Sequence, residues 1–131
     1  MGQPRLILLD THVVIWLASG GQRLSASAEN AIQNSQGLAI SAISLWELAM
    51  IGHTGRIRIT LTLESFLRDV EARFNVVPIS AGVCAKAMAL PESYPKDPAD
   101  RLIGATALVE GISLVTADRN IRRSRAVPTI W

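Results

Sequence analysis

Cysteine and histidine are scarce in this chain. Cys84 is the one cysteine, and His12 and His53 are the two histidines. A single thiol cannot form a disulfide framework, and a cysteine-type zinc site lacks its ligands. The lone thiol suits a reducing cytoplasm, where we expect the protein to reside. We expect Cys84 to be a small core residue and His12 to pack beside Trp16, and we assign neither histidine to the chemistry.

Several sequence motifs of nucleotide-binding and hydrolytic enzymes are also missing. No Gly-x-Gly-x-x-Gly follows the first apolar run and no Gly-x-x-x-x-Gly-Lys occurs, which excludes dinucleotide and P-loop sites. The Gly-x-Ser-x-Gly elbow of α/β-hydrolases is absent as well. Polar or charged residues interrupt every apolar run well short of membrane-spanning length. We therefore expect a soluble protein, without a targeting segment at its start.

Composition favours one folded domain over residues 1–131. The chain is 49% hydrophobic with a mean hydropathy of +0.28, so it can bury a sizeable core. Its formal net charge of +2 and isoelectric point near 9.2 fit two classes: an ordinary slightly basic soluble protein, or a protein with a polyanionic partner.

Short β-like runs alternate with longer helical patterns along the chain. Such alternation predicts a mostly parallel sheet with helices on both faces, an α/β fold. The predicted strands are 5–9, 38–40, 76–79, 113–116 and 127–130, with a brief extended piece at 57–59. The predicted helices are 11–18, 25–35, 44–52, 62–74, 80–90, 97–110 and 118–123.

Four acidic residues stand where these strands end or helices begin: Asp10, Glu47, Asp100 and Asp118. Each has a structural explanation as a helix cap, and Ser44 with Glu47 matches a capping box. Strand ends in a parallel sheet gather at one edge, however, where ligands bind. Four crowded carboxylates repel one another, and a bound hard cation relieves the repulsion.

The surroundings of these acids favour a site. Glu47 is the only charge in an apolar helix, and a buried charge must be paired or bind metal. If the four acids hold cations, thirteen lysines and arginines face seven remaining acids, an excess of six positive charges on the rest of the surface. A basic body around an acidic notch suits a phosphodiester substrate.

Four motifs in this order resemble the PIN-domain ribonuclease toxins of the VapC family. They are Leu8-Leu9-Asp10-Thr11-His12, Ser41-Ala42-Ile43-Ser44-Leu45-Trp46-Glu47, Asp97-Pro98-Ala99-Asp100-Arg101-Leu102-Ile103 and Leu114-Val115-Thr116-Ala117-Asp118. The resemblance implies a three-layer α/β/α sandwich with a central, mostly parallel sheet. It also implies a ribonuclease dependent on Mg²⁺ or Mn²⁺, frequent homodimers, and inhibition by a cognate antitoxin protein.

Carried over motif by motif, the resemblance makes Asp10, Glu47, Asp100 and Asp118 the catalytic cluster. Asp10, Asp100 and Asp118 are the expected metal ligands, and Glu47 either ligates the metal or orients and deprotonates the attacking water. Asp97, beside Pro98, is expected to cap a helix instead.

Further residues beside these motifs are candidates for contacts with the ligands or the RNA. Thr11 and Thr116 are candidates for hydrogen bonds to ligand oxygens. The arginine candidates for phosphate contacts, with the alternative of a solvated helix face, are Arg101 and Arg119, together with Arg122, Arg123 and Arg125. Trp16 and Trp46 are expected in the core.

Two other functions remain open from the sequence. One is a non-catalytic PIN domain that binds RNA or protein, and the other is a metal-dependent phosphoesterase or DNA nuclease with a similar acidic notch.

Overall fold

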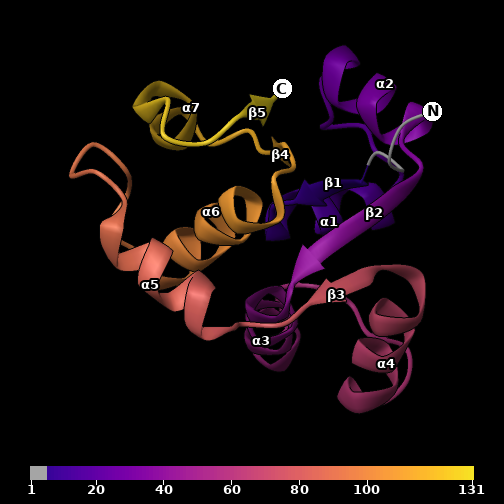
Figure 1. The fold of residues 1–131 in the computed structure, drawn as a ribbon. Coiled ribbons are helices and arrows are strands. Elements are labelled where there is room, and N and C mark those ends of the chain that lie inside the picture. Colours follow the sequence, from indigo (N-terminus) through magenta and orange to yellow (C-terminus); the bar gives the residue numbers. More distant parts are fainter. Residues whose placement is uncertain (1–5) are drawn as a thin grey trace.

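The computed structural model describes residues 6–131, so the predicted strand start at Arg5 lies outside the described residues. Strands and helices alternate along the described part of the chain (Figure 1). They are β1 (Leu6–Leu9), α1 (Thr11–Ala18), α2 (Ala26–Asn34), β2 (Gly37–Ser41), α3 (Ala42–His53), α4 (Leu63–Arg73), β3 (Asn75–Val77), α5 (Ala81–Ala89), α6 (Pro98–Glu110), β4 (Leu114–Val115), α7 (Arg119–Ser124) and β5 (Thr129–Ile130).

The strands form one parallel sheet in the order β3-β2-β1-β4-β5, which confirms the predicted sheet. β1 lies at the centre, where Leu8 is in register with Ala39 of β2 and Leu114 of β4. The chain builds outward from β1 first on one side and then on the other. This reversal creates a switch point between the carboxyl ends of β1 and β4, the usual place for a ligand in such sheets.

Alternate residues of the central strands face two separate hydrophobic cores. Leu9, Ile40 and Val115 pack with residues of α1, α2, α3 and α4. Leu8, Ala39 and Leu114 pack on the opposite face with residues of α6 and α7. The predicted three-layer α/β/α sandwich is therefore confirmed, and its two cores hold the central strand rigidly from both sides. No helix among residues 6–131 is long and apolar enough to cross a bilayer.

Most element ends follow the sequence signals. The first helix has the predicted bounds, and Gly111 ends α6 in a left-handed conformation with φ of +67°. α3, however, begins at Ala42 rather than Ser44, because Ser41 caps it by accepting a hydrogen bond from the Ile43 amide at 3.2 Å. The brief extended piece predicted at residues 57–59 is not a strand.

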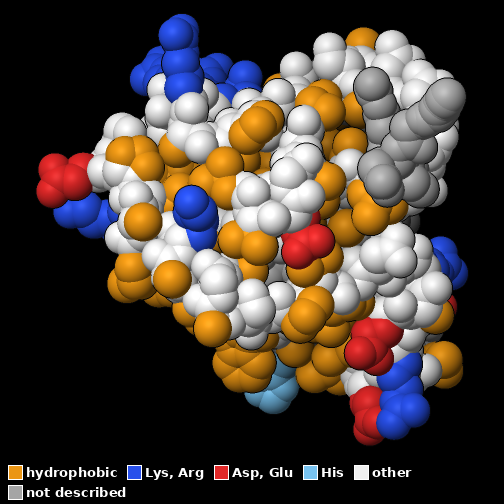
Figure 2. Space-filling model, in the orientation of Figure 1, with side chains coloured by type: hydrophobic (Ala, Val, Ile, Leu, Met, Phe, Trp, Pro, Cys, Tyr) orange, Lys and Arg blue, Asp and Glu red, His pale blue; other side chains and the backbone are white. Residues whose placement is uncertain are grey.

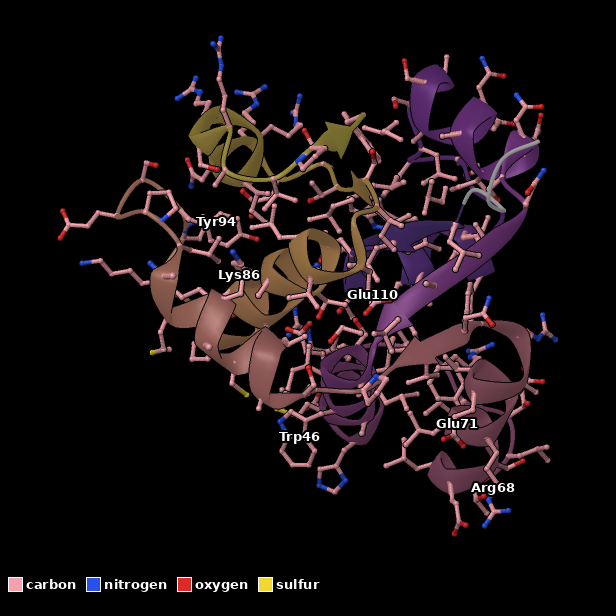
Figure 3. The ribbon with its side chains drawn as sticks, in the orientation of Figure 1. Trp46, Arg68, Glu71, Lys86, Tyr94 and Glu110 are labelled. Atoms are coloured by element: carbon pink, nitrogen blue, oxygen red, sulfur yellow. The ribbon has the colours of Figure 1, made fainter. Side chains whose placement is uncertain are left out.

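Two predicted core residues lie on the surface instead. Trp46 is 61% exposed and points away from α3 (Figure 3), and Cys84 is also exposed. α3 is apolar on almost every side, so its sequence pattern could not show which side faces solvent. On α5 the buried face consists of Val83 and Ala87, which turns the neighbouring Cys84 outward.

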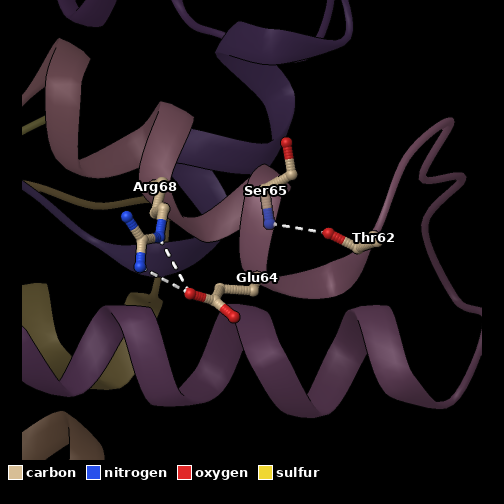
Figure 4. Close-up of polar contacts among 4 residues, drawn as sticks. All are labelled: Thr62, Glu64, Ser65 and Arg68. Carbon is tan, nitrogen blue, oxygen red and sulfur yellow. Dashed lines mark hydrogen bonds and ion pairs between the residues drawn. The ribbon is translucent and has the colours of Figure 1, made fainter.

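Helix α4 offers a test of local capping. The Thr62 hydroxyl accepts a hydrogen bond from the Ser65 amide at 3.1 Å, and Arg68 pairs with Glu64 at 2.6 Å on the same exposed turn (Figure 4). We expect Thr62→Ala to lower the free energy of unfolding by about 1 kcal/mol, since an amide of the first turn loses its partner. Urea denaturation measures this. Thr60→Ala, outside the helix, is the matched control, and an equal loss in both variants would contradict the capping role.

Candidate active site

Asp10 joins the two central strands at the switch point. It follows β1 directly and is buried, with 8% of its surface exposed. One carboxylate oxygen, Oδ1, accepts a hydrogen bond from the Thr11 amide at 2.8 Å, and Oδ2 accepts one from the Thr116 hydroxyl at 2.7 Å. Thr116 directly follows β4, the neighbouring strand. Both oxygens are therefore fixed by residues at the carboxyl edge of the sheet.

Glu47 is directed to the same region by the residue after Asp10. The Thr11 hydroxyl donates to Glu47 Oε1 at 2.5 Å and lies 2.8 Å from the Ser44 hydroxyl. A threonine hydroxyl has one proton, so Ser44 is the donor in the second bond. The predicted capping box of Ser44 and Glu47 is therefore wrong, since the earlier start of α3 places Ser44 inside the helix. Ser44 instead supports the hydroxyl that holds Glu47.

Asp118 begins the last helix and is linked to Asp10 through a shared threonine. Its Oδ1 accepts hydrogen bonds from the Asn120 and Ile121 amides at 2.8 and 3.0 Å. Its own amide donates to Thr116 Oγ1 at 3.1 Å, the same hydroxyl that donates to Asp10. Thr116 therefore fixes the spacing between these two acidic residues.

Asp100 lies in the first turn of α6. Asp97 caps this helix, with Pro98 at its start, and its Oδ1 accepts a hydrogen bond from the Asp100 amide at 3.1 Å. The capping role predicted for Asp97 is confirmed. Asp10 and Asp118 cap helices too, so in both cases capping coexists with a place at the sheet edge.

The charges of the other three predicted acids act on Asp100. Burial, the largest cause, and the negative charges of Asp10, Asp97, Asp118 and Glu47 together raise the pKa of Asp100 to about 7. Burial is also the main cause that raises the pKa values of Asp10 and Glu47. The negative charge of Asp10 contributes to the raised pKa of Glu47.

The carboxylates nevertheless do not form a complete coordination site for a metal ion. Within residues 6–131, no three acidic, histidine or cysteine side chains are arranged so that they could hold one ion. The predicted metal site therefore stays a prediction. The charges of the other acids raise the pKa of Asp100, yet no three of these side chains surround a common point within residues 6–131.

The other predicted site residues fall into two groups. Thr11 and Thr116 bond to carboxylate oxygens, as proposed from the sequence, while any contact with substrate stays a prediction. Arg119 is exposed in the first turn of α7, where basic side chains gather (Figure 2). The Arg101 guanidinium is engaged elsewhere: it donates to the backbone carbonyls of Ala87, Leu90 and Tyr94 at 3.1–3.5 Å.

Sequence reasoning missed Tyr94. This residue is 1% exposed, and its hydroxyl donates to the backbone carbonyl of Asp100 at 2.7 Å. The sequence signal that could have drawn attention to it is the absence of any other tyrosine, together with a glycine one turn after Asp100 in a well-formed helix.

A large cleft opens away from the carboxylates. It has a volume of about 820 Å³ and lies between α1, α4 and the connection before α4. Apolar side chains line much of it, with arginines among them. The lining includes Val14, Leu17, Leu38, Leu48, Phe66, Phe74, Arg23, Arg56 and Arg58, and also the acidic Asp69.

Comparison with known proteins identifies the family of this chain. The family model described as "PIN domain" matches residues 7–126. The chain belongs to the PIN-domain family. It is 43% identical over 127 residues to "Ribonuclease VapC22" of Mycobacterium tuberculosis, with 95% of this chain and 98% of that protein covered. The predicted membership in the VapC branch of the PIN domains is therefore confirmed.

Two solved structures resemble the fold. The VapBC-1 structure from nontypeable Haemophilus influenzae has a TM-score of 0.73 at 18% identity, covering 95% of this chain and 96% of that one. A toxin–antitoxin complex from Klebsiella pneumoniae has a TM-score of 0.65 at 26% identity, with 88% of each chain covered.

The raised pKa of Asp100 predicts a stability that falls with pH. Between about pH 4 and pH 7, the folded chain keeps a proton on Asp100 that the unfolded chain has already lost. The free energy of unfolding should therefore decrease as pH rises through 7 in metal-free buffer. Asp100→Asn removes the titrating group, so the free energy of unfolding of this variant should decrease less between pH 5 and pH 8 than that of the parent. Urea denaturation at a series of pH values measures both, and parallel curves for the two proteins would contradict the shift.

Proposed function

We propose that this PIN domain is a metal-dependent endoribonuclease that acts as the toxin of a toxin–antitoxin pair. The observation that carries the proposal is the hydrogen bonding at the switch point of the sheet, where Thr116 bonds to both Asp10 and Asp118 and Thr11 bonds to Glu47. The charges of these three acids also raise the pKa of Asp100. Holding several carboxylates together costs free energy, so a fold that keeps them needs a compensating ligand. The 43% identity to a protein named as a ribonuclease supports RNA as the substrate.

The donor chemistry at this edge fits Mg²⁺ or Mn²⁺. The coupled groups are carboxylates, and hard cations of this kind prefer oxygen ligands and water. We propose Asp10, Asp100 and Asp118 as the ligands; since no three acidic side chains surround a common point in the part of the chain that the structure describes, their carboxylates would have to draw together when an ion binds. A bound ion would lower the pKa of a water molecule and neutralise the charge of the scissile phosphate.

The protein groups then have distinct tasks. The Thr116 hydroxyl keeps Asp10 in place, and the Thr11 hydroxyl keeps one oxygen of Glu47 oriented. Glu47 can accept the proton of the attacking water, since burial raises its pKa toward the working range of a general base. Arg119 is exposed beside Asp118 and suits a contact with a neighbouring RNA phosphate.

Substitution of two ligands tests the catalytic proposal. We expect Asp10→Asn and Asp100→Asn each to lower Mn²⁺-dependent RNA cleavage by more than about 100-fold, because metal sites lose 10- to 100-fold even from changes in supporting residues. Sequencing of RNA ends after induced expression, with the variants in parallel, identifies the cut sites. Glu71→Gln, exposed on helix α4, is the control for loss of one negative charge.

The same assays separate the remaining functions. Cleavage by Asp10→Asn at the parent rate would reject the mechanism. Binding of RNA without metal-stimulated turnover would favour a non-catalytic PIN domain. Faster turnover of DNA or of a small phosphoester than of RNA would favour the other phosphoesterase functions.

The proposed partner is a cognate antitoxin protein. Structures of this fold are described as VapBC and toxin–antitoxin complexes. On this chain, the 820 Å³ cleft offers apolar surface to a protein segment, while Arg23, Arg56 and Arg58 favour acidic residues on it. Growth arrest on expression of this chain, relieved by co-expression of the antitoxin, would support the toxin role.

We further propose a homodimer that forms through α3. Trp46 is 61% and Met50 44% exposed, and a spacing of four residues places both on one helix face. Large apolar side chains grouped on a surface usually mark an interface. A copy of the chain would cover Trp46 with the same apolar face, since a two-fold interface pairs each patch with itself.

Trp46→Arg tests this interface. Placing a like charge on both copies should shift the molar mass in solution from that of a dimer to that of one chain, because the two arginines meet across the two-fold axis. Light scattering after gel filtration measures the mass. Leu61→Arg, at another exposed apolar residue, is the control and should leave the dimer intact. A dimeric Trp46→Arg variant would reject the interface, and so would a monomeric parent.

A further inference from the structure

Tyr94 is buried in a slot that the sequence of α6 leaves open for it. The residue lies between the loop after α5 and helix α6, with 1% of its surface exposed (Figure 3). Gly104 lies beneath its ring. A Cβ at Gly104 would collide with the Tyr94 hydroxyl and would stand only 2.7 Å from Cζ. Glycine at this position therefore allows the phenol to reach the backbone of the preceding helical turn.

The phenol hydroxyl reaches the backbone of Asp100. It donates to the Asp100 carbonyl at 2.7 Å, and burial raises the pKa of Tyr94, which keeps this donor protonated. The Asp100 amide is held on its other side by Asp97 Oδ1 at 3.1 Å. Both peptide groups that flank the Asp100 Cα are thus bound by side chains from outside the helical ladder.

Arg101 also links the start of α6 to the loop that carries Tyr94. From the first turns of α6 it donates to the carbonyls of Ala87 and Leu90, at the end of α5, and to that of Tyr94. The Tyr94 amide in turn donates to the Pro91 carbonyl at 3.0 Å. The loop and the first turn of α6 are therefore tied in both directions, with Tyr94 bonding to α6 and α6 bonding back to Tyr94.

We propose that Tyr94 is a positioning residue that fixes the direction of the Asp100 carboxylate toward Asp10 and Asp118. The inference rests on the proposed function, since it assigns Asp100 to a metal site. Two fixed peptide planes set the direction of the Cα–Cβ bond, and that direction decides where the carboxylate can reach. A hydroxyl on a buried ring is suited to this task, because packing over Gly104 leaves it few alternative positions.

Mn²⁺ binding by the full chain without RNA provides the test. Tyr94→Phe deletes the hydroxyl but keeps the ring in its slot, so it should fold. Its Mn²⁺ affinity, measured by electron paramagnetic resonance of the free ion, should fall about 10-fold, the lower end of the loss seen when a group that orients a ligand is removed. In RNA cleavage, the Mn²⁺ concentration for half-maximal rate should rise equally, with a rate near that of the parent at saturating Mn²⁺.

Val83→Ala is the matched control for stability. Val83 packs in the small core between α5 and α6 and makes no hydrogen bond with Asp100. It should lower the unfolding midpoint at least as much as Tyr94→Phe while binding Mn²⁺ like the parent. Gly104→Ala forces the phenol from its slot and should weaken Mn²⁺ binding as Tyr94→Phe does.

The outcomes distinguish failure of the positioning role of Tyr94 from failure of the proposed metal site. If the parent binds Mn²⁺ and Tyr94→Phe binds it equally well, Tyr94 has no positioning role and the metal site stands. Equal weakening in Val83→Ala would also overturn the inference, since general loosening would then explain the loss. If the parent binds no Mn²⁺, or binds it no better than Asp100→Asn, the proposed metal site itself fails.

Discussion

Repulsion among partly buried carboxylates is the constraint around which this structure is organised. Asp10, Glu47, Asp100 and Asp118 come from four separate parts of the sequence, and the charges of the other three raise the pKa of Asp100. Such an arrangement costs free energy and survives only if the rest of the fold enforces it. The enforcing contacts are short hydroxyl bonds: Thr116 holds Asp10, and Thr11 holds Glu47.

The fold supplies that enforcement through its topology. Parallel strands place the carboxyl ends of β1 and β4 side by side, and two cores clamp the central strand from opposite faces. Helix capping and the acidic cluster are then two results of one geometry. Asp10 and Asp118 satisfy amides of the helices that begin there, and those helices begin where the strands deliver their acids. A capping explanation and a catalytic one therefore do not compete at these positions.

The sequence predicted the fold because its signals were local. Apolar runs, Ser and Thr caps, and glycines such as Gly111 mark the elements, and their alternation implies the sheet. The acids could be named because they adjoin those elements. Orientation was harder: Trp46 on a helix apolar all round gave no sign of facing solvent. The roles of Ser44, Tyr94 and Arg101 depend on partners between 6 and 33 residues away, and only tertiary packing reveals those contacts.

The lengths of the outer strands have a consequence for how this molecule can associate. β3 has three residues and β5 only two, and they form the two margins of the sheet. Margins this brief offer few free backbone groups to an incoming strand, which protects the chain from edge-to-edge aggregation. Assembly is thereby directed to helix surfaces, where side-chain shape rather than backbone pairing selects the partner. An apolar helix face can in this way bind a partner of matching shape without promoting non-specific association of the sheet.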